Sequence, residues 1–349
     1  MLGKVTGLSS EELMNRVRYI DALKGLAIIF VVLGHVSNGY INQGAINELF
    51  VGTHKIATAF HMPLFFAVSG FLFCRAYISN DGSVKREKLN TQILNLVCIY
   101  CFYSALLWVF KYSLSAFVNT QLTVKNLLMI PIKPFELYWY LYIVILYYLV
   151  FSCTFVNRQN EYAIIILTIA MAVISYWVPE TWLFGIKNFL YFIPYFHLGC
   201  VISRHVEMQN KKALVFALVP ILVLFFTIFW NNEKQINSIR FVNLIVGIGM
   251  TICLFGAFKQ YRFLGDNKIL SSIGRYSLEI YLFHTYFVTF CRTVFNKLRI
   301  DNSLMIIVIS TSIGVVAPIV IACISKKIGI HKYMFAPYKT LVKNRNPKK

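Results

Sequence analysis

Long apolar stretches alternate with short polar stretches along almost the whole chain. Many of the apolar stretches are close to the length of about 20 residues that a helix needs to cross a bilayer. Because lipid offers no hydrogen-bond partner to a bare backbone, such segments fold as helices. The pattern therefore predicts an all-α polytopic membrane protein with about ten transmembrane helices. The expected spans are residues 19–40, 56–78, 93–114, 137–156, 161–178, 187–203, 213–230, 239–257, 273–292 and 303–325.

The composition agrees with this pattern and narrows the possible classes of protein. Of the 349 residues, 58% are hydrophobic and 14% are charged, with a mean hydropathy of +0.64. Soluble globular domains have about 45–50% hydrophobic and about 25% charged residues. The composition excludes a soluble enzyme, a disordered chain and a nucleic-acid-binding domain. We expect a single membrane domain over residues 1–349, whose first apolar stretch is a retained span and not a cleaved signal peptide.

The positive charge indicates the orientation in the membrane. The chain has 34 lysines and arginines against 14 acidic residues, a formal net charge of +20. With ten spans both termini lie on one side, and 24 of the 34 cations fall on that side. Because positive residues stay in the cytoplasm, both termini are predicted to be cytoplasmic. The basic tail 326–349 would then face anionic lipids. Arg292, Lys297 and Arg299, in the last outer loop, are the exception to this bias.

The first span carries ionisable side chains, which are costly in a membrane and are functional candidates for that reason. Lys24 and His35 are 11 residues apart, so they share one helix face and lie about 16 Å apart along the axis. That face would hold a cation near the cytoplasm and an imidazole near the outer surface. The structural alternatives are a hydrogen-bonded packing histidine at His35 and a lysine that snorkels to the interface at Lys24.

The second span runs in the opposite direction and brings a second imidazole. His61 lies near its outer end and is expected at a depth similar to that of His35. Pro63 is expected to break the helix close to that end.

Farther along the same span, small residues precede a cation. Ser69 and Gly70 permit close backbone approach, either around a substrate or in plain helix packing. Arg75 lies at the cytoplasmic end and is expected to be level with Lys24.

The ninth span contributes three more candidates. Arg275 lies at its cytoplasmic end, Glu279 roughly level with Lys24, and His284 in the middle of the membrane. Glu279 and His284 are about 140° apart around the helix, so we do not expect them to act on one another. Glu279 could instead neutralise a cation such as Lys24 or Arg75, which is the structural alternative to a supporting role at the site.

Glu136 and Trp139 open the fourth span on the outer side and are supporting candidates. The tyrosines around Trp139 are typical of the aromatic belt of a membrane protein, and a sugar-stacking site is the alternative.

Together these residues form two layers. Lys24, Arg75 and Arg275 would form a cationic layer at the cytoplasmic face, which suits a phosphate-bearing donor. His35 and His61 would form an imidazole layer toward the outside, and imidazole is suited to general-base chemistry because its ordinary pKa is near neutrality. The gap of about 16 Å suits a long flexible arm such as pantetheine.

These residues also carry a family resemblance. The chain resembles the acyltransferase-3 family of ten-helix membrane acyltransferases, which includes O-acetyltransferases of bacterial surface polysaccharides. The family pattern has an arginine where this chain has Lys24, and lysine keeps the charge without the bidentate fork. The matching stretches are YIDALKGLAIIFVVLGH (19–35), FHMPLFFAVSGFLFCR (60–75), LYWYLYIVILYYL (137–149), FIPYFHLGCVISR (192–204) and SIGRYSLEIYLFH (272–284).

The resemblance implies an acyl-CoA donor, usually acetyl-CoA, bound from the cytoplasm, and no metal. The acceptor would be a sugar hydroxyl on a polysaccharide or a lipid-linked sugar, at the bacterial cytoplasmic membrane. His35 would be the catalytic histidine, Lys24 and Arg75 would be donor-side cations, and the segment Ser69, Gly70 and Phe71 would line the acyl path.

Two alternatives remain open at this point. The polar layers could line the permeation path of a transporter or flippase for a glycan intermediate, although the chain lacks the paired broken helices typical of transporters. Within acyl transfer, the group could be succinyl instead of acetyl, or the acceptor could be a small free molecule.

Overall fold

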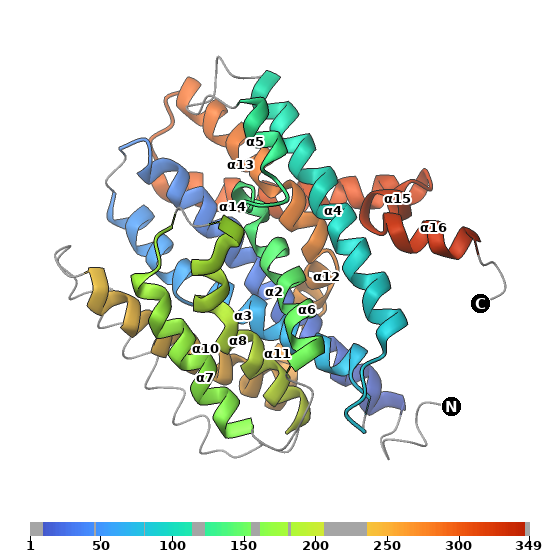
Figure 1. The fold of residues 1–349 in the computed structure, drawn as a ribbon. Helices are drawn as coiled ribbons and strands as arrows, with labels where there is room; N and C mark the ends of the chain where they lie inside the picture. The colour runs from blue at the N-terminus through green and yellow to red at the C-terminus, as the bar shows by residue number, and fades with distance from the viewer. Residues whose placement is uncertain are drawn as a thin grey trace. The chain divides into compact units, whose positions relative to one another are not determined.

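The structure is a computed structural model that describes residues 10–44, 47–79, 81–113, 123–154, 161–180, 183–205 and 236–345. Most of these residues are helical, in the order shown in Figure 1. The β-type pairing in this part of the chain is one isolated bridge between Ile78 and Val84. Nine of the ten predicted spans fall in helices, and the seventh span, 213–230, lies outside the described residues.

The helices vary widely in length, from a single turn to more than eight turns. The longer ones are α2 Ser10–Ile41, α3 Glu48–Tyr77, α4 Arg86–Ser113, α6 Trp139–Thr154, α7 Glu161–Ile174, α8 Ile186–Arg204, α10 Ile236–Gln260, α13 Ser277–Lys297 and α14 Ser303–Lys327. The shorter ones are α5 Val124–Leu128, η2 Glu136–Tyr138, η4 Ser175–Trp177, η5 Leu183–Gly185, α11 Arg262–Gly265, α12 Lys268–Arg275, α15 His331–Phe335 and α16 Pro337–Arg345.

Among the described residues, six helical segments are long and apolar enough to cross a membrane. They are Arg18–Ile41, Glu48–Tyr77, Arg86–Tyr112, Glu136–Cys153, Val242–Gln260 and Ser303–Lys327. The prediction of an all-α, multi-pass membrane protein is therefore confirmed. The count of ten spans and the cytoplasmic position of the termini stay predictions.

The predicted break at Pro63 is wrong. Helix α3 runs without interruption through Pro63, as α8 does through Pro194 and α14 through Pro318. A proline removes one backbone hydrogen bond, but a helix that ended within the apolar layer would leave several more polar groups unpaired. Helix α3 also begins at Glu48, eight residues before the predicted start of this span.

The ninth predicted span, 273–292, consists of parts of two helices. α12 ends at Arg275 and α13 begins at Ser277, with Tyr276 between them in a non-helical conformation. The side chain of Asn267 caps the start of α12 by accepting hydrogen bonds from two backbone N–H groups. Arg275 therefore belongs to a different helix from Glu279 and His284.

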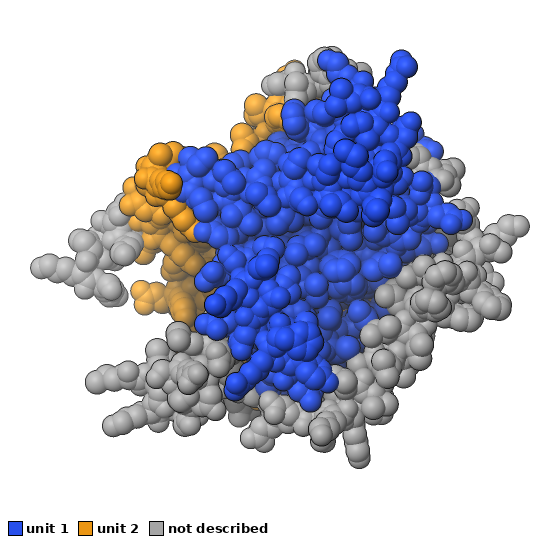
Figure 2. Space-filling model, turned by 180° about the vertical axis from the view of Figure 1, so that it is seen from behind, with its two compact units in different colours: residues 1–68, 205–324 blue, residues 69–204, 325–349 orange. Residues whose placement is uncertain are grey.

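The chain divides into two compact units, coloured separately in Figure 2. Unit 1 comprises residues 1–68 and 205–324. In it, α2 packs against α10, α11, α12 and α13. The buried core around α2 consists of Ile28, Val31, Val32, Val36, Tyr40, Phe50, Ile280, Val288, Cys291, Phe295, Ile306, Ile307 and Val315.

Unit 2 comprises residues 69–204 and 325–349. Aromatic rings fill its interior: Phe196 lies 5.7 Å from Phe73, 5.0 Å from Tyr147 and 4.7 Å from Phe151, between ring centroids.

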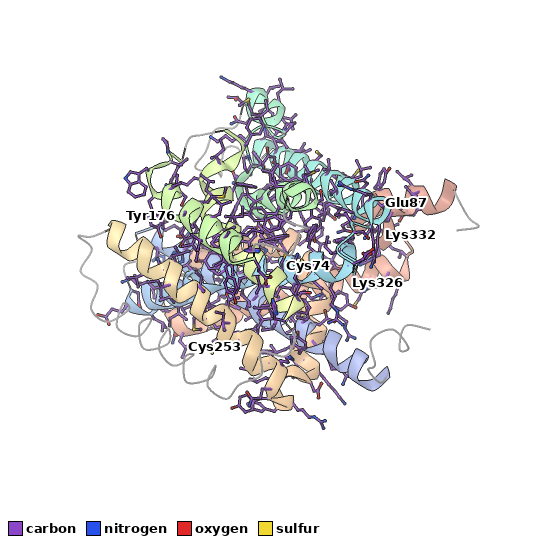
Figure 3. All side chains as sticks on the ribbon, turned by 60° about the horizontal axis from the view of Figure 1, so that its bottom comes forward. Cys74, Glu87, Tyr176, Cys253, Lys326 and Lys332 are labelled. Atoms are coloured by element: carbon purple, nitrogen blue, oxygen red, sulfur yellow. The ribbon has the colours of Figure 1, made fainter. Side chains whose placement is uncertain are left out.

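The predicted basic tail 326–349 is largely folded. It includes the end of α14 and the helices α15 and α16, and α16 packs along α4. The backbone N–H of Lys339 donates to Asn95 Oδ1 over 3.4 Å. Figure 3 labels Lys326 and Lys332, which come from α14 and α15.

Candidate functional site

The first helix carries the predicted cation and imidazole as one continuous element. α2 has no break between Lys24 and His35, so the two side chains share a face as the spacing predicts. The Lys24 ammonium forms an ion pair of 2.6 Å with Asp21, one turn earlier on the same helix. Both side chains are about four-fifths buried, with 22% and 17% exposed. An anionic ligand would therefore compete with Asp21 for Lys24.

Two glycines bring α12 against α2 beside Lys24. A Cβ at Gly25 would lie 2.0 Å from the Leu270 carbonyl oxygen, and a Cβ at Gly274 would lie 1.7 Å from the Asp21 carbonyl oxygen. The two backbones thus touch where a larger residue would not fit. The last turn of α12, which ends in the exposed Arg275, is therefore held against the turn of α2 that carries Lys24.

His35 and His284 lie together in unit 1. Their ring centroids are 5.1 Å apart, and the ring planes are inclined by 51°. His284 Nδ1 is 2.9 Å from the carbonyl oxygens of both Ile280 and Tyr281. A carbonyl accepts and cannot donate, so Nδ1 of His284 carries the proton and Nε2 of the neutral ring is an acceptor. This Nε2 is buried and has no hydrogen-bond partner.

Accessibility distinguishes the two rings. His284 is fully buried, whereas His35 is partly exposed. Within the described residues, no hydrogen bond involves the His35 ring, and this argues against the alternative of a hydrogen-bonded packing histidine. Of the two rings, His35 is the one that retains exposed surface.

Two further histidines on α3 belong to the same group. His61 Nδ1 donates to the carbonyl oxygen of Ala57, and His54 Nδ1 lies 3.3 Å from the carbonyl oxygen of Gly34. His35, His54, His61 and His284 are close enough to interact electrostatically.

His54 is not among the predicted site residues, because the hydropathy pattern predicts that the second span begins at residue 56. The acidic first turn of α3, at Glu48, is the start signal that could have placed His54 inside the helix. His54 lies beside the turn of α2 that holds His35, because its Nδ1 is 3.3 Å from the carbonyl oxygen of Gly34.

In unit 2, Ser69 is the member of the predicted small-residue segment with a polar partner. Its Oγ lies 2.7 Å from the hydroxyl of Tyr140 on α6. Tyr140 was not predicted, because its neighbourhood of tyrosines is typical of an aromatic belt.

Gly70 and Phe71 are closely packed. A Cβ at Gly70 would lie 1.8 Å from the Phe196 carbonyl oxygen, and Cys200 Sγ is 3.3 Å from the carbonyl oxygen of Gly70. Phe71 is only 2% exposed. Gly70 therefore serves close packing of α3 on α8. Arg75 is exposed at the end of α3, with its guanidinium carbon 5.9 Å from the centre of the Phe71 ring.

The remaining predicted residues are held by local partners. Glu136 forms an ion pair with Lys111, and the Trp139 ring lies 5.3 Å from that of Phe192, both within unit 2. In unit 1, Glu279 is 6% exposed and lies in the first turn of α13, where the helix dipole favours a carboxylate.

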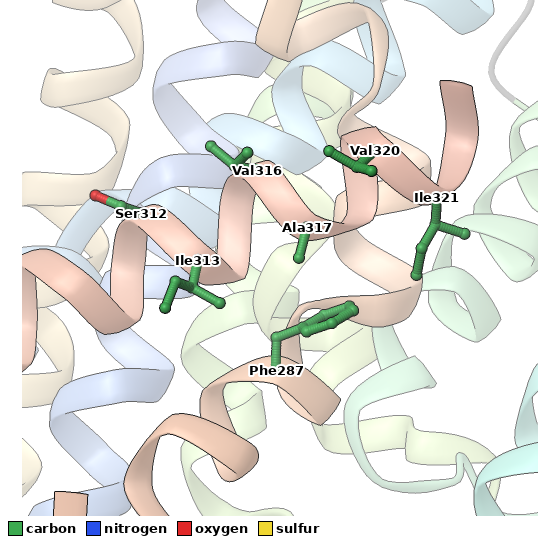
Figure 4. Close-up of a pocket in the computed structure, with 7 residues that line it drawn as sticks. All are labelled: Phe287, Ser312, Ile313, Val316, Ala317, Val320 and Ile321. Atoms are coloured by element: carbon green, nitrogen blue, oxygen red, sulfur yellow. The ribbon is translucent and has the colours of Figure 1, made fainter. Parts of the chain in front are cut away.

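A groove of about 570 Å³ lies between α13 and α14 and is shown in Figure 4. Apolar residues make up nearly all of its lining, and none of the predicted site residues contributes. The lining residues are Phe287, Ser312, Ile313, Val316, Ala317, Val320 and Ile321.

Metal-binding geometry does not occur in the part of the chain that the structure describes. No group of three or more His, Cys, Asp or Glu side chains is arranged there to hold an ion, and the four histidines are not an exception.

The helices thus define a polytopic membrane protein with buried and half-buried imidazoles. A family profile described as an acyltransferase domain matches residues 17–323, and the chain belongs to this family, acyltransferase-3. Membership of this family favours acyl transfer over the transporter alternative.

Two relatives share part of the sequence. The chain is 28% identical over 198 residues to a nodulation protein NolL of Mesorhizobium japonicum. The matched region covers 56% of this chain and 50% of the relative. The chain is 26% identical over 245 residues to a nodulation protein NolL of Sinorhizobium fredii. This matched region covers 66% of this chain and 62% of the relative. The chain therefore spans half to about three-fifths of these relatives. No solved structure matches the chain at a significant level.

Proposed function

We propose that this protein is a membrane O-acyltransferase that moves an acetyl group from acetyl-CoA to a hydroxyl of a cell-surface or lipid-linked carbohydrate. The observation that carries the proposal is the partly exposed His35 ring beside the buried His284 ring, whose Nε2 has no hydrogen-bond partner. His35 shares its helix face with Lys24, in a chain of the acyltransferase family.

His35 acts as the general base. It takes the proton of the acceptor hydroxyl while the hydroxyl oxygen bonds to the carbonyl carbon of the thioester. The carbon–sulfur bond then breaks, and the proton passes from His35 to the departing CoA sulfur. His284 Nε2 is an acceptor without a partner in the structure, and we propose that it accepts the N–H of His35 during the reaction, which leaves the other nitrogen of His35 to act as the base.

The donor binds through its phosphates at the opposite end of this face. Lys24 and Arg275 provide this positive charge in unit 1. Arg75, in unit 2, is a further candidate for contact with the donor phosphates. Ser69 and its partner Tyr140 line the acyl path, together with Gly70 and Phe71 at its edge.

The remaining candidates support the site or the acceptor. His61 belongs to the imidazole group around His35, and Glu279 adds a buried negative charge to unit 1. Glu136 and Trp139 are proposed to face the acceptor.

The proposal includes the membrane arrangement predicted from the sequence. Residues 1–349 form one membrane acyltransferase domain of about ten spans in the bacterial cytoplasmic membrane, with both termini in the cytoplasm. The tail 326–349 contributes basic side chains at a surface of anionic lipid.

The direct test replaces His35 with alanine. We expect cell-surface O-acetyl groups, measured by mass spectrometry of the glycan, to be lost in cells that carry only the variant. Purified His35→Ala in nanodiscs is expected to lose the acceptor-dependent release of free CoA. The matched control is His331→Ala, a histidine of α15 outside the site. Unchanged acetylation at normal protein levels would contradict the proposal.

The same assay separates the alternatives. Glycan transport without any thioester consumption would point to a flippase, and consumption of succinyl-CoA in place of acetyl-CoA would change the acyl group but not the role of His35.

A further inference from the structure

Arg292 on α13 is a half-buried cation without a carboxylate partner. None of the ion pairs found among the described residues includes it. It also belongs to the last predicted outer loop, the one place where the chain departs from the charge bias that sets its orientation. Topology therefore does not explain this arginine, and neither does a structural ion pair.

The guanidinium occupies a space that a glycine leaves open. A Cβ at Gly39 would lie 2.1 Å from Nη1 and 3.3 Å from Cζ of Arg292. Gly39 follows His35 by four residues on α2, so it lies on the same face about 6 Å farther along the axis. Arg292 therefore stands about one turn beyond His35, on the side away from Lys24.

A second polar group at the same place lacks a partner. Tyr40 is 6% exposed, and its hydroxyl is buried without a hydrogen bond. Its ring is fixed by stacking on Phe50, with centroids 4.9 Å apart and planes inclined by 3°. The hydroxyl is close enough to Arg292 for the two to interact electrostatically. Burying a hydroxyl without a partner is costly, which suggests that a ligand supplies the partner.

We propose that Arg292 and Tyr40 form an oxyanion-binding subsite for the acceptor, which recognises a carboxylate or a phosphate ester on the carbohydrate. Guanidinium presents a planar set of N–H donors that matches both groups, and the tyrosine hydroxyl donates to the same anion. The assignment to the acceptor rests on the proposed function of His35.

Position along α2 separates this subsite from the donor phosphates. Gly39 and Lys24 are 15 residues apart, or about 23 Å along the helix. A donor whose phosphates lie at Lys24 and whose thioester reaches His35 has no further anion to place beyond His35. The group bound at Arg292 therefore belongs to the second substrate, and the acceptor carries a negative charge close to the hydroxyl that is acylated.

The test measures sugar binding without turnover. The full chain with His35→Ala, in nanodiscs of neutral lipid, is titrated with glucuronate, glucose 6-phosphate and glucose by saturation-transfer NMR. We expect the anionic sugars to bind about tenfold or more tightly than glucose, since a hydrogen bond to a charged group is worth about that factor. The stronger of the two anionic probes distinguishes a carboxylate from a phosphate.

Three variants connect the preference to this site. Arg292→Gln is expected to reduce the affinity for both anionic sugars to the affinity for glucose. Gly39→Ala displaces the guanidinium while it keeps every charge, and it should have the same effect. The matched control, Lys297→Gln, removes an exposed cation of the same helix and should change nothing.

The outcomes are separable from those for the proposed function. No preference for anionic sugars in the parent, including no detectable binding, would overturn the inference. So would equal losses in Arg292→Gln and Lys297→Gln. Acetyl transfer to a neutral sugar at a rate independent of Arg292 would also overturn it, and would leave the function of His35 standing.

Discussion

His284 offers the sharpest test of how the histidine pair works. Its Nδ1 is already used by two backbone carbonyls, and its Nε2 is buried beside His35 without a partner. If Nε2 orients His35, the bond between the rings strengthens when His35 becomes an imidazolium ion. A hydrogen bond to a charged group is worth about 1.5–3 kcal/mol, which corresponds to about 10- to 100-fold in rate. We therefore expect His284→Leu to lower kcat by about that factor.

The effect on stability should have the opposite sign. An unpaired buried acceptor costs about 1–3 kcal/mol, and leucine fills a similar volume without one. We expect the apparent Tm of His284→Leu to equal or exceed that of the wild type. Glutamine supplies an amide oxygen that can accept from His35, so His284→Gln should recover part of kcat.

The assay follows acceptor-dependent CoA release by the purified protein, with kcat and KM determined separately and Tm measured by intrinsic fluorescence. A change confined to kcat is expected, because the proposed mechanism places His284 in contact with His35 and with neither substrate. An unchanged kcat in His284→Leu, or a loss that follows a fall in Tm, would refute the positioning role and leave His284 as a packing residue.

Three further predictions concern other contacts. Gly274→Ala places a Cβ 1.7 Å from the backbone oxygen of Asp21, and we expect a loss of about 1–3 kcal/mol, seen as a lower Tm. Asp21→Asn removes the partner of Lys24, and the KM for acetyl-CoA should fall several-fold in steady-state kinetics because the donor phosphates no longer compete with a carboxylate. Burial, and secondly the charge of Lys88, lower the pKa of Lys339, so Lys88→Ala should raise that pKa in a titration of ¹³C-methylated lysines.

Each of these has a control or a contrary outcome. Gly52→Ala meets open space on α3 and should leave Tm unchanged or slightly higher, so an equal loss in both glycine variants would speak against the α2–α12 contact. A rise in KM for Asp21→Asn would mean that Asp21 orients Lys24 instead of competing for it. An unshifted pKa of Lys339 would show that Lys88 is too far away to act on it.

The periodicity of apolar residues predicts those features of the protein that depend on a single helix. The helical class follows from apolar runs in a solvent without hydrogen-bond partners, and the shared face of Lys24 and His35 follows from their spacing. The boundaries were less certain, because hydropathy rises gradually at a helix end. For that reason His54 was not placed in the predicted second span, although Glu48 marks the start of the helix. The helix continues through Pro63, contrary to the prediction, because ending a helix in lipid costs more than the one backbone hydrogen bond that a proline removes.

The hydropathy pattern does not predict contacts between segments that are distant in the sequence. His35 meets His284, and Arg292 meets Gly39, across about 250 residues of sequence. Each contact depends on how α13 packs on α2, and a residue that lies on a suitable face of its own helix can meet any of several partners. Gly39 lacks a side chain, so its identity alone does not predict that a guanidinium occupies the space beside it. Its role, and that of the buried Tyr40 hydroxyl, is decided by tertiary packing, because packing sets which polar groups are left without partners.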